Sequence, residues 1–177
     1  FLKMSYFPNL KKPSHFLATF FGVGLLPLAP GTWGSLAALF LFYILIFFQL
    51  SLSLYSLLLG VTIITAIIVC YFASSELSEK DHQSIVIDEV AGAGVSFLFL
   101  PALGVYDFTK ENWNENSYLA AALLLILFRL FDILKPHPIS FVDKRFKSGF
   151  GIVLDDLLAG VFAGLTLLGG NFFIDFF

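Results

Sequence analysis

The sequence predicts an all-α membrane protein: a polytopic helical bundle of about five transmembrane helices, with a re-entrant or interfacial helix near the N-terminus. Composition is the first reason, because 58% of the 177 residues are hydrophobic, 13% are charged and the mean hydropathy is +0.89. Soluble domains are typically about 45–50% apolar and 25% charged. The second reason is the spacing of apolar runs, several of which approach the roughly 20 residues that a spanning helix needs. No internal repeat or linker interrupts the chain, so residues 1–177 are expected to form a single domain.

The first apolar run is short for a transmembrane span. It extends from His15 to Leu28, about fourteen residues, and contains Gly22, Gly24 and Pro27. A run of this length and composition fits a re-entrant or interfacial segment better than a spanning helix.

A turn rich in proline and glycine, PLAPGTWGS, leads into the first predicted span. Thr32 or Ser35 could cap that helix. Polar loops separate the later apolar runs, and a basic loop over residues 135–148 precedes the last one. The five predicted spans are Trp33–Gln49, Leu54–Ser74, Ser84–Pro101, Ser117–Leu134 and Gly149–Leu168.

Lysine and arginine predict the orientation of the bundle, because short cytoplasmic loops carry an excess of both. With five spans, eight of the basic residues outside the spans lie on the side of the N-terminus and only Lys110 lies on the other. The N-terminus is therefore expected in the cytoplasm. Lys144, Arg145 and Lys147 are expected to contact anionic lipid headgroups, with substrate binding as an alternative. No basic patch of the kind that nucleic acids require is present, so no nucleic-acid partner is expected.

Ionisable residues lie at the cytoplasmic margins of three predicted spans. A charged side chain at the centre of a bilayer costs roughly 2.5 to 3.5 kcal/mol, so such residues normally pair, face a bundle interior or bind an ion. Asp88, Asp132 and Asp155 each lie about one turn inside a helix end, and therefore at a similar depth. Three independent segments thus predict one acidic site at the cytoplasmic face.

Carboxylates at one depth repel one another unless they are protonated or bridged by a cation. Mg²⁺ is the expected cofactor, since it takes oxygen ligands and is often held by carboxylates together with substrate phosphate. Adjacent acids on a helix point about 100° apart, so one of each pair is expected to bind metal while the other orients water or a ligand. The alternative is that these acids only cap helix N-termini, where the helix dipole favours anions. The candidate metal ligands are Asp81, Asp88, Glu89, Asp132, Asp155 and Asp156.

Groups that could bind a phosphate accompany the acids. Lys135 lies three residues after Asp132 and so on the same helix face. The PGTWGS segment offers backbone N–H groups at a helix start, although a plain turn is the alternative interpretation. Arg129, about one turn deeper, is expected to pair with a site carboxylate. His82 is a candidate for proton transfer, and Ser84 could equally cap its helix.

The remaining features predict packing contacts. Gly92 and Gly94, together with Gly160 and Gly164, are typical of close contacts between membrane helices. Cys70 lies within an apolar run and is expected to be an inert packing residue. The clustered histidines and cysteines of a zinc site are absent from the sequence.

Four sequence blocks, in this order, closely resemble the phosphatidylglycerophosphatase A family: GLLPLAPGTWGSLAA, DHQSIVIDE, FRLFDILKPHPI and GIVLDDLLAG. The resemblance implies a magnesium-dependent enzyme of the bacterial inner membrane that removes the terminal phosphate of phosphatidylglycerophosphate and yields phosphatidylglycerol. Soluble relatives are similar to a compact six-helix bundle, which implies that the segment from His15 to Leu28 is the sixth helix. One departure is Lys80, where some relatives have histidine; if that histidine is catalytic, its role moves here to His82 or an acid. The resemblance implies functional positions at Thr32, Asp81, Ser84, Asp88, Glu89, Asp132, Lys135, Asp155 and Asp156.

These observations together predict a Mg²⁺-dependent phosphatase that acts on a lipid phosphomonoester at the cytoplasmic face. The attacking group is either water at the metal or an aspartate that forms a phospho-enzyme, and the sequence leaves both open. The alternative function is a membrane cation transporter, which acids at the midplane and inverted repeats would favour. A membrane enzyme that makes phospholipid headgroups by transfer to an alcohol would need a binding motif for an activated nucleotide, which we do not find in the sequence. The catalytic candidates are Asp88, Asp132, Asp155, Asp156 and His82. The candidate substrate ligands are Thr32, Ser35, Ser84 and Lys135.

Overall fold

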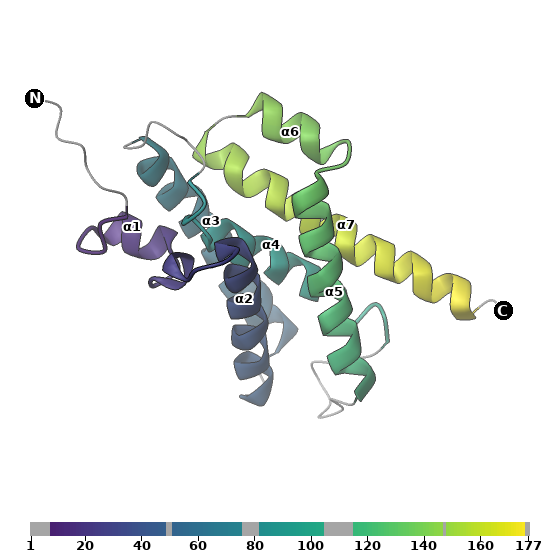
Figure 1. Ribbon diagram of the computed structural model, residues 1–177. Helices are drawn as coiled ribbons and strands as arrows, with labels where there is room; N and C mark the ends of the chain where they lie inside the picture. The colour runs from purple at the N-terminus through teal and green to yellow at the C-terminus, as the bar shows by residue number, and fades with distance from the viewer. Residues whose placement is uncertain (1–7, 49–50, 76–81, 105–114, 147, 176–177) are drawn as a thin grey trace, which may run out of the picture.

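The computed structural model describes residues 8–48, 51–75, 82–104, 115–146 and 148–175. These residues form helices and turns, with no strand among them, which confirms the all-α prediction (Figure 1). The elements in chain order are α1 (Pro13–Ala18), the 3₁₀ helix η1 (Val23–Leu25), α2 (Pro30–Phe47), α3 (Leu52–Ser75), α4 (Ile87–Phe97), α5 (Glu115–Leu134), α6 (Ile139–Arg145) and α7 (Gly149–Asp175).

Four helices are long and apolar enough to cross a membrane: α2, α3, α5 and α7. They contain 18 to 27 residues each and correspond to four of the five predicted spans. At a rise of about 1.5 Å per residue, each is close to the thickness of the hydrocarbon core or longer. Four of the five predicted spans therefore form helices with the length and apolar composition of a transmembrane segment.

Helix α4 is much shorter than the span predicted from Ser84 to Pro101. It has 11 residues, about half of what a spanning helix needs, and nine of them are buried. Figure 1 shows α4 at the centre of the bundle, with the four long helices around it. The predicted span is therefore too long, and α4 lies in the enclosed core of the protein. Its small residues explain the difference, because they let neighbouring helices approach from all sides.

Glycines form the contact between α4 and α7. A Cβ atom at Gly92 would overlap the backbone of Asp156, and one at Gly160 would overlap the carbonyl oxygen of Gly92. Further along α7, a Cβ atom at Gly164 would overlap the ring of Phe99, which lies two residues beyond the end of α4. The predicted small-residue contacts are confirmed, and they place Gly92, in the second turn of α4, directly beside Asp156 and Gly160 of α7.

Substitution of Gly160 by alanine is therefore expected to destabilise the bundle. The added methyl group meets a backbone carbonyl that can move only if α4 and α7 separate, and overpacking of this kind typically costs about 1–3 kcal/mol. The melting temperature in detergent should fall by roughly 2–4 °C for each kcal/mol. Gly60→Ala on α3 is the matched control, because its Cβ would lie in open space. Equal melting temperatures for Gly160→Ala and wild type would contradict this packing.

The N-terminal region differs from a single sixth helix. The apolar run is divided between α1 and η1, with left-handed backbone at Phe20 and Phe21 and at Gly22. Both helices are too short to cross a bilayer, as predicted for this segment. Neither predicted cap is used at the next helix, because α2 begins at Pro30 with no side-chain cap. A further short helix, α6, lies within the predicted basic loop.

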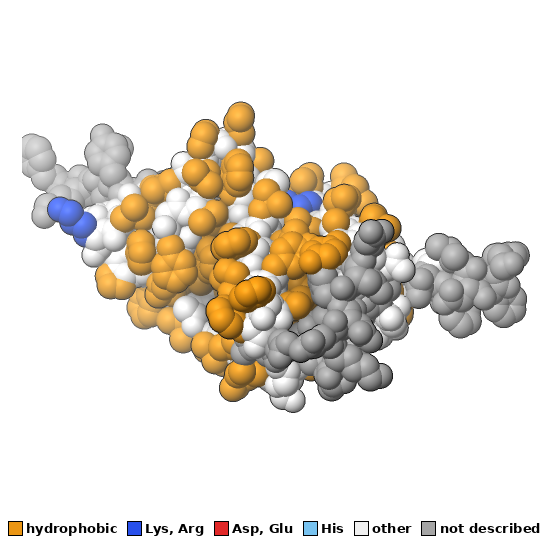
Figure 2. All heavy atoms as spheres, turned by 90° about the horizontal axis from the view of Figure 1, so that it is seen from below, with side chains coloured by type: hydrophobic (Ala, Val, Ile, Leu, Met, Phe, Trp, Pro, Cys, Tyr) orange, Lys and Arg blue, Asp and Glu red, His pale blue; other side chains and the backbone are white. Residues whose placement is uncertain are grey.

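The ends of several helices meet at one end of the bundle. The start of α7 lies against the end of α3, since a Cβ atom at Gly149 would overlap the backbone of Tyr71. The start of α2 lies against the start of α4, where a Cβ atom at Gly34 would press on Val86. The opposite face, seen from below in Figure 2, is covered mainly by hydrophobic side chains, and no acidic side chain is visible on it among the described residues. The buried acids described on α4 and α7 are thus not exposed on that face.

Candidate functional site

Three carboxylates from α4 and α7 form a compact group, called here the acidic cluster: Asp88, Glu89 and Asp156. One carboxylate oxygen of each residue lies within 4.8 Å of the others. Asp88 and Asp156 are each only 4% exposed, and the side chain of Glu89 is 15% exposed. Asp88 and Glu89 occupy the first turn of α4, where the helix dipole stabilises negative charge. The glycine contact between α4 and α7 brings Asp156 to the same place.

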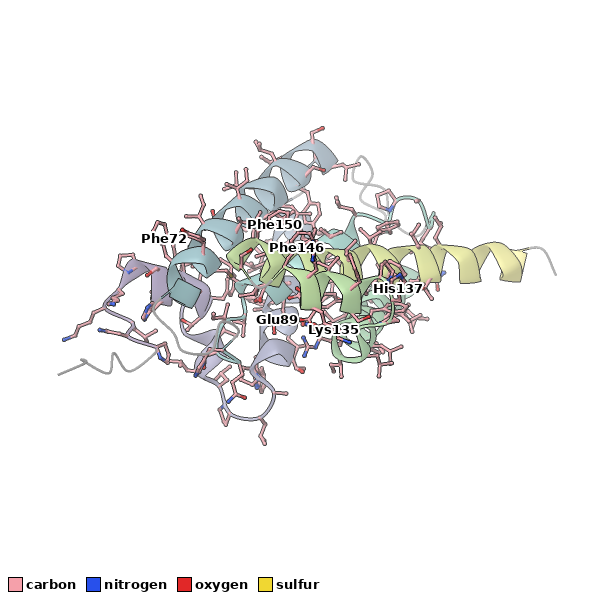
Figure 3. All side chains as sticks on the ribbon, turned by 90° about the horizontal axis from the view of Figure 1, so that it is seen from above. Phe72, Glu89, Lys135, His137, Phe146 and Phe150 are labelled. Atoms are coloured by element: carbon pink, nitrogen blue, oxygen red, sulfur yellow. The ribbon has the colours of Figure 1, made fainter. Side chains whose placement is uncertain are left out.

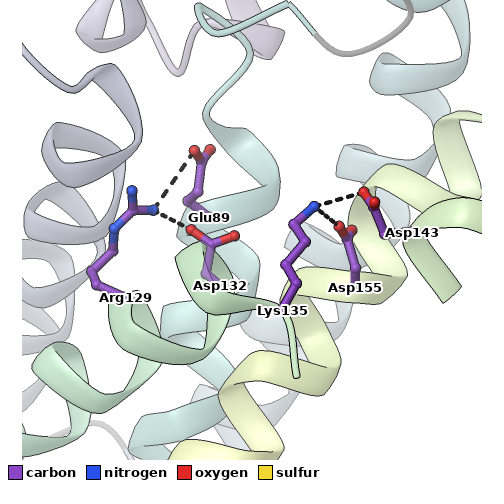
Figure 4. A network of polar contacts seen from close by, with 6 residues as sticks. All are labelled: Glu89, Arg129, Asp132, Lys135, Asp143 and Asp155. Carbon is purple, nitrogen blue, oxygen red and sulfur yellow. Dashed lines mark hydrogen bonds and ion pairs between the residues drawn. The ribbon is translucent and has the colours of Figure 1, made fainter. Parts of the chain in front are cut away.

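Helix α5 adds an arginine and a fourth acid to the acidic cluster. Arg129 Nη1 lies 2.6 Å from Asp132 Oδ2 and 3.8 Å from Glu89 Oε1 (Figure 4). Asp132 is also within hydrogen-bonding reach of Asp156. The prediction that Arg129 pairs with a site carboxylate is confirmed. The start of α2 closes this side of the site, because a Cβ atom at Gly31 would overlap both Glu89 and Arg129.

A second polar group lies next to the first and is centred on Lys135. Its ammonium lies 2.7 Å from Asp143 Oδ1 on α6 and 2.5 Å from Asp155 Oδ2 on α7 (Figure 4). Burial lowers the pKa of Lys135, but hydrogen bonds to Asp143 and Asp155 outweigh it and raise the pKa above its usual value. The ammonium therefore stays charged at the edge of the acidic site. In the view from above, Glu89 and Lys135 again lie close together beside α6 (Figure 3).

Asp143 is the member of this group that the sequence analysis missed. It lies in the segment interpreted as a basic loop, among Lys144 and Arg145. The signal that could have found it is the spacing of Ile139 and Val142, which are both buried and lie three residues apart, as on one face of a short helix. The next residue of that helix is Asp143.

The acidic cluster has more negative charge than its neighbours neutralise. Burial is the largest cause that raises the pKa of Glu89, to about 8, followed by the charge of Asp156. Glu89 Oε2 is buried and has no hydrogen-bond partner among the described residues. A group of carboxylate oxygens that retains a proton near neutral pH, with one oxygen still to be satisfied, fits a hard divalent cation. The residues therefore suit the cation that the sequence predicts.

The remaining predicted residues lie outside these two groups of contacts. Thr32 is exposed in the first turn of α2, beside Gly31. The hydroxyl of Ser35 is buried and donates to the Gly31 carbonyl at 2.8 Å, so it is engaged within its own helix. The backbone N–H of Ser84 donates to His82 Nδ1 at 3.2 Å, which leaves Nε2 as the protonated nitrogen of a neutral ring. Asp81, predicted as a metal ligand, lies outside the described residues, as does Lys80.

Comparison with known proteins places the chain among lipid phosphatases. The model of a family described as Phosphatidylglycerophosphatase A matches residues 16–171, which include all the acids and cations of both groups. Phosphatidylglycerophosphatase A of Escherichia coli (strain K12) is 36% identical over 92% of this chain and 87% of the relative, and that of Haemophilus influenzae is 36% identical over 90% and 89%. A putative phosphatidylinositol-3-phosphatase of Bacteroides thetaiotaomicron is 33% identical over 89% and 95%. No solved structure gives a significant match.

Proposed function

The chain belongs to the phosphatidylglycerophosphatase A family, and we propose that it is a membrane phosphatase that hydrolyses phosphatidylglycerophosphate to phosphatidylglycerol and inorganic phosphate. The observation that carries the proposal is the match over residues 16–171 to a family of that activity, combined with buried acids and two cations at one end of an apolar bundle. A lipid substrate suits this arrangement, because its acyl chains can stay in the bilayer while the headgroup reaches the helix ends.

We further propose that the reaction requires Mg²⁺, held by Asp88, Glu89 and Asp156, with Asp132 adjacent. Support comes from the short distances among the three carboxylates and from the buried oxygen of Glu89 that no described residue satisfies. When bound, the ion would neutralise phosphoryl oxygens and polarise the ester. Arg129 would hold Asp132 and Glu89 in orientation, because it contacts both.

Lys135 is the group best placed to bind the phosphate from the other side. Its ammonium is charged and partly exposed, and it lies beside Asp155 at the margin of the acidic cluster. Hydrolysis breaks the bond between phosphorus and the ester oxygen, adds a water oxygen to phosphorus and returns a proton to the departing alcohol. His82, with its Nε2 proton, is the candidate to move that proton.

The proposed site faces the cytoplasm of a bacterial cell, at the inner membrane. Lys144 and Arg145 are exposed on α6, the helix that also supplies Asp143 to Lys135. Basic residues beside helix ends favour the cytoplasmic side of a membrane, where they meet anionic headgroups. The bacterial origin of the relatives is in agreement with this location.

Metal binding is expected to be measurable without turnover. Because the pKa of Glu89 is about 8 against an ordinary value of 4.5, the cation-free folded protein keeps a proton that the unfolded chain releases between these pH values. The melting temperature in EDTA should therefore fall as the pH rises through this window. Mg²⁺ replaces the proton, so its stabilising effect should be larger at pH 8.5 than at pH 6. Glu89→Gln should reduce both effects, and unchanged melting curves with and without Mg²⁺ would contradict the site.

A panel of phosphate esters tests the substrate. Purified protein in mixed micelles should release phosphate from phosphatidylglycerophosphate faster than from phosphatidic acid or a phosphatidylinositol 3-phosphate. Glycerol 3-phosphate, which lacks acyl chains, should be the poorest substrate. Rapid hydrolysis of the soluble ester would contradict a lipid phosphatase. Absence of hydrolysis by folded protein, with Mg²⁺ flux into proteoliposomes, would instead favour the alternative of cation transport.

A further inference from the structure

The ammonium of Lys135 is held from two sides by acids of different character. Asp155 on α7 is nearly buried, with a side chain 5% exposed, whereas the Asp143 side chain on α6 is 39% exposed. The buried aspartate belongs to the wall of the site, but the exposed one does not. With Asp155 as its sole partner, the ammonium could move along the surface of α7. The contact with Asp143 restricts it to a position between α6 and α7.

The backbone around this pair is also fixed. Lys135 follows the last residue of α5, has a positive φ of 41°, and donates its N–H to the Phe131 carbonyl at 2.8 Å. On α6, Ile139 is fully buried and Val142 is 9% exposed, so the helix that carries Asp143 is anchored by its apolar face. The backbone is therefore fixed at both residues of the ion pair. The contact with Asp143 then determines where the ammonium at the end of the flexible Lys135 side chain lies.

We propose that Asp143 is a positioning residue of the phosphatase reaction, which holds the Lys135 ammonium where it meets the phosphoryl group. This inference rests on the proposed function. Asp143 acts through Lys135 and touches neither the acidic cluster nor the phosphate. Its own negative charge repels the negatively charged phosphate, so it opposes substrate binding while it orders the Lys135 ammonium. Loss of Asp143 therefore acts mainly on turnover and not on substrate binding.

The kinetic effect of Asp143→Asn distinguishes positioning from a structural role. We expect kcat to fall about tenfold, in line with the loss of one charge-assisted hydrogen bond that is partly exposed, and KM to stay unchanged or decrease. Asp143→Glu, which keeps the charge, should restore most of the turnover. Asp175→Asn at the last residue of α7 is the matched control, because it makes the same chemical change twenty residues beyond Asp155.

A double-mutant cycle with Lys135→Gln, using enough protein to measure slow turnover, completes the test. If Asp143 acts through Lys135, Asp143→Asn should have no further effect in the Lys135→Gln background. An equal loss of kcat in both backgrounds, or no loss in the single variant, would overturn the inference. If Asp143→Asn does not fold, Asp143→Ser takes its place in the same cycle with the same criteria. Wild-type protein that fails to hydrolyse phosphatidylglycerophosphate would instead reject the proposed function.

Discussion

Replacement of Asp155 by asparagine is expected to reduce phosphate release from phosphatidylglycerophosphate by about 10²–10⁴-fold, while the bundle stays folded. Asparagine has nearly the same volume, so the packing of α7 is kept. It loses the charge that holds the Lys135 ammonium at 2.5 Å in a nearly buried position. The Lys135 ammonium would then be held by Asp143 alone, away from the wall of the site that Asp155 forms.

The test of Asp155→Asn is the rate of phosphate release at saturating Mg²⁺. Circular dichroism and the melting temperature show whether the variant is folded. Asp132→Asn is expected to behave in the same way, because Asp132 lies within reach of Asp156 and is held by Arg129. Turnover close to that of wild type in either folded variant would remove that residue from the site.

Replacement of Arg129 by glutamine is expected to damage both stability and activity. Arg129 is 18% exposed and contacts Asp132 and Glu89, whose side chains are 14% and 15% exposed. Removal of one partner from a buried ion pair typically costs about 3–5 kcal/mol, because the remaining charges are left without compensation. The melting temperature should therefore fall by roughly 2–4 °C for each kcal/mol.

The matched control for Arg129→Gln is Arg145→Gln on α6, where the arginine is exposed and the same change should leave the melting temperature unchanged. Mg²⁺ should recover part of the stability lost in Arg129→Gln, since a bound cation replaces part of the missing positive charge. Arg129→Lys keeps the charge but loses the planar fork, and should be intermediate. A melting temperature equal to that of wild type for Arg129→Gln would show that the acids need no arginine.

The parts of the fold that depend on length and composition could be predicted from the sequence. Four long apolar runs became α2, α3, α5 and α7, because a run of about 20 apolar residues has few other structures available. Helix α4 was predicted too long, since hydropathy does not distinguish a segment surrounded by lipid from one surrounded by protein. Helix α6 was missed because its seven residues, close to lysines and arginines, are too few to show the apolar spacing of a helix. Both differences arise from tertiary packing.

That acids from different helices lie together could be predicted from the sequence, but the partner of each acid could not. Acids near helix ends are expected to share a level, and Asp88, Glu89 and Asp156 lie within reach of one another. On α7 the two adjacent acids have different neighbours, since Asp155 contacts Lys135 and Asp156 joins the acidic cluster. On α4 both acids join the same cluster. Which side of a helix faces which neighbour depends on crossing angles, and these are set by contacts such as that of Gly160 with Gly92.

We propose that this end of the bundle hydrolyses a lipid phosphate with a divalent cation held by its acids. The most direct measurement is phosphate release from phosphatidylglycerophosphate by purified wild-type protein in detergent, titrated with Mg²⁺ and repeated in excess EDTA. We expect saturable release that rises with Mg²⁺ and falls to background in EDTA, with Asp155→Asn at background throughout. Release that continues undiminished in EDTA, or an Asp155→Asn variant as fast as wild type, would contradict it.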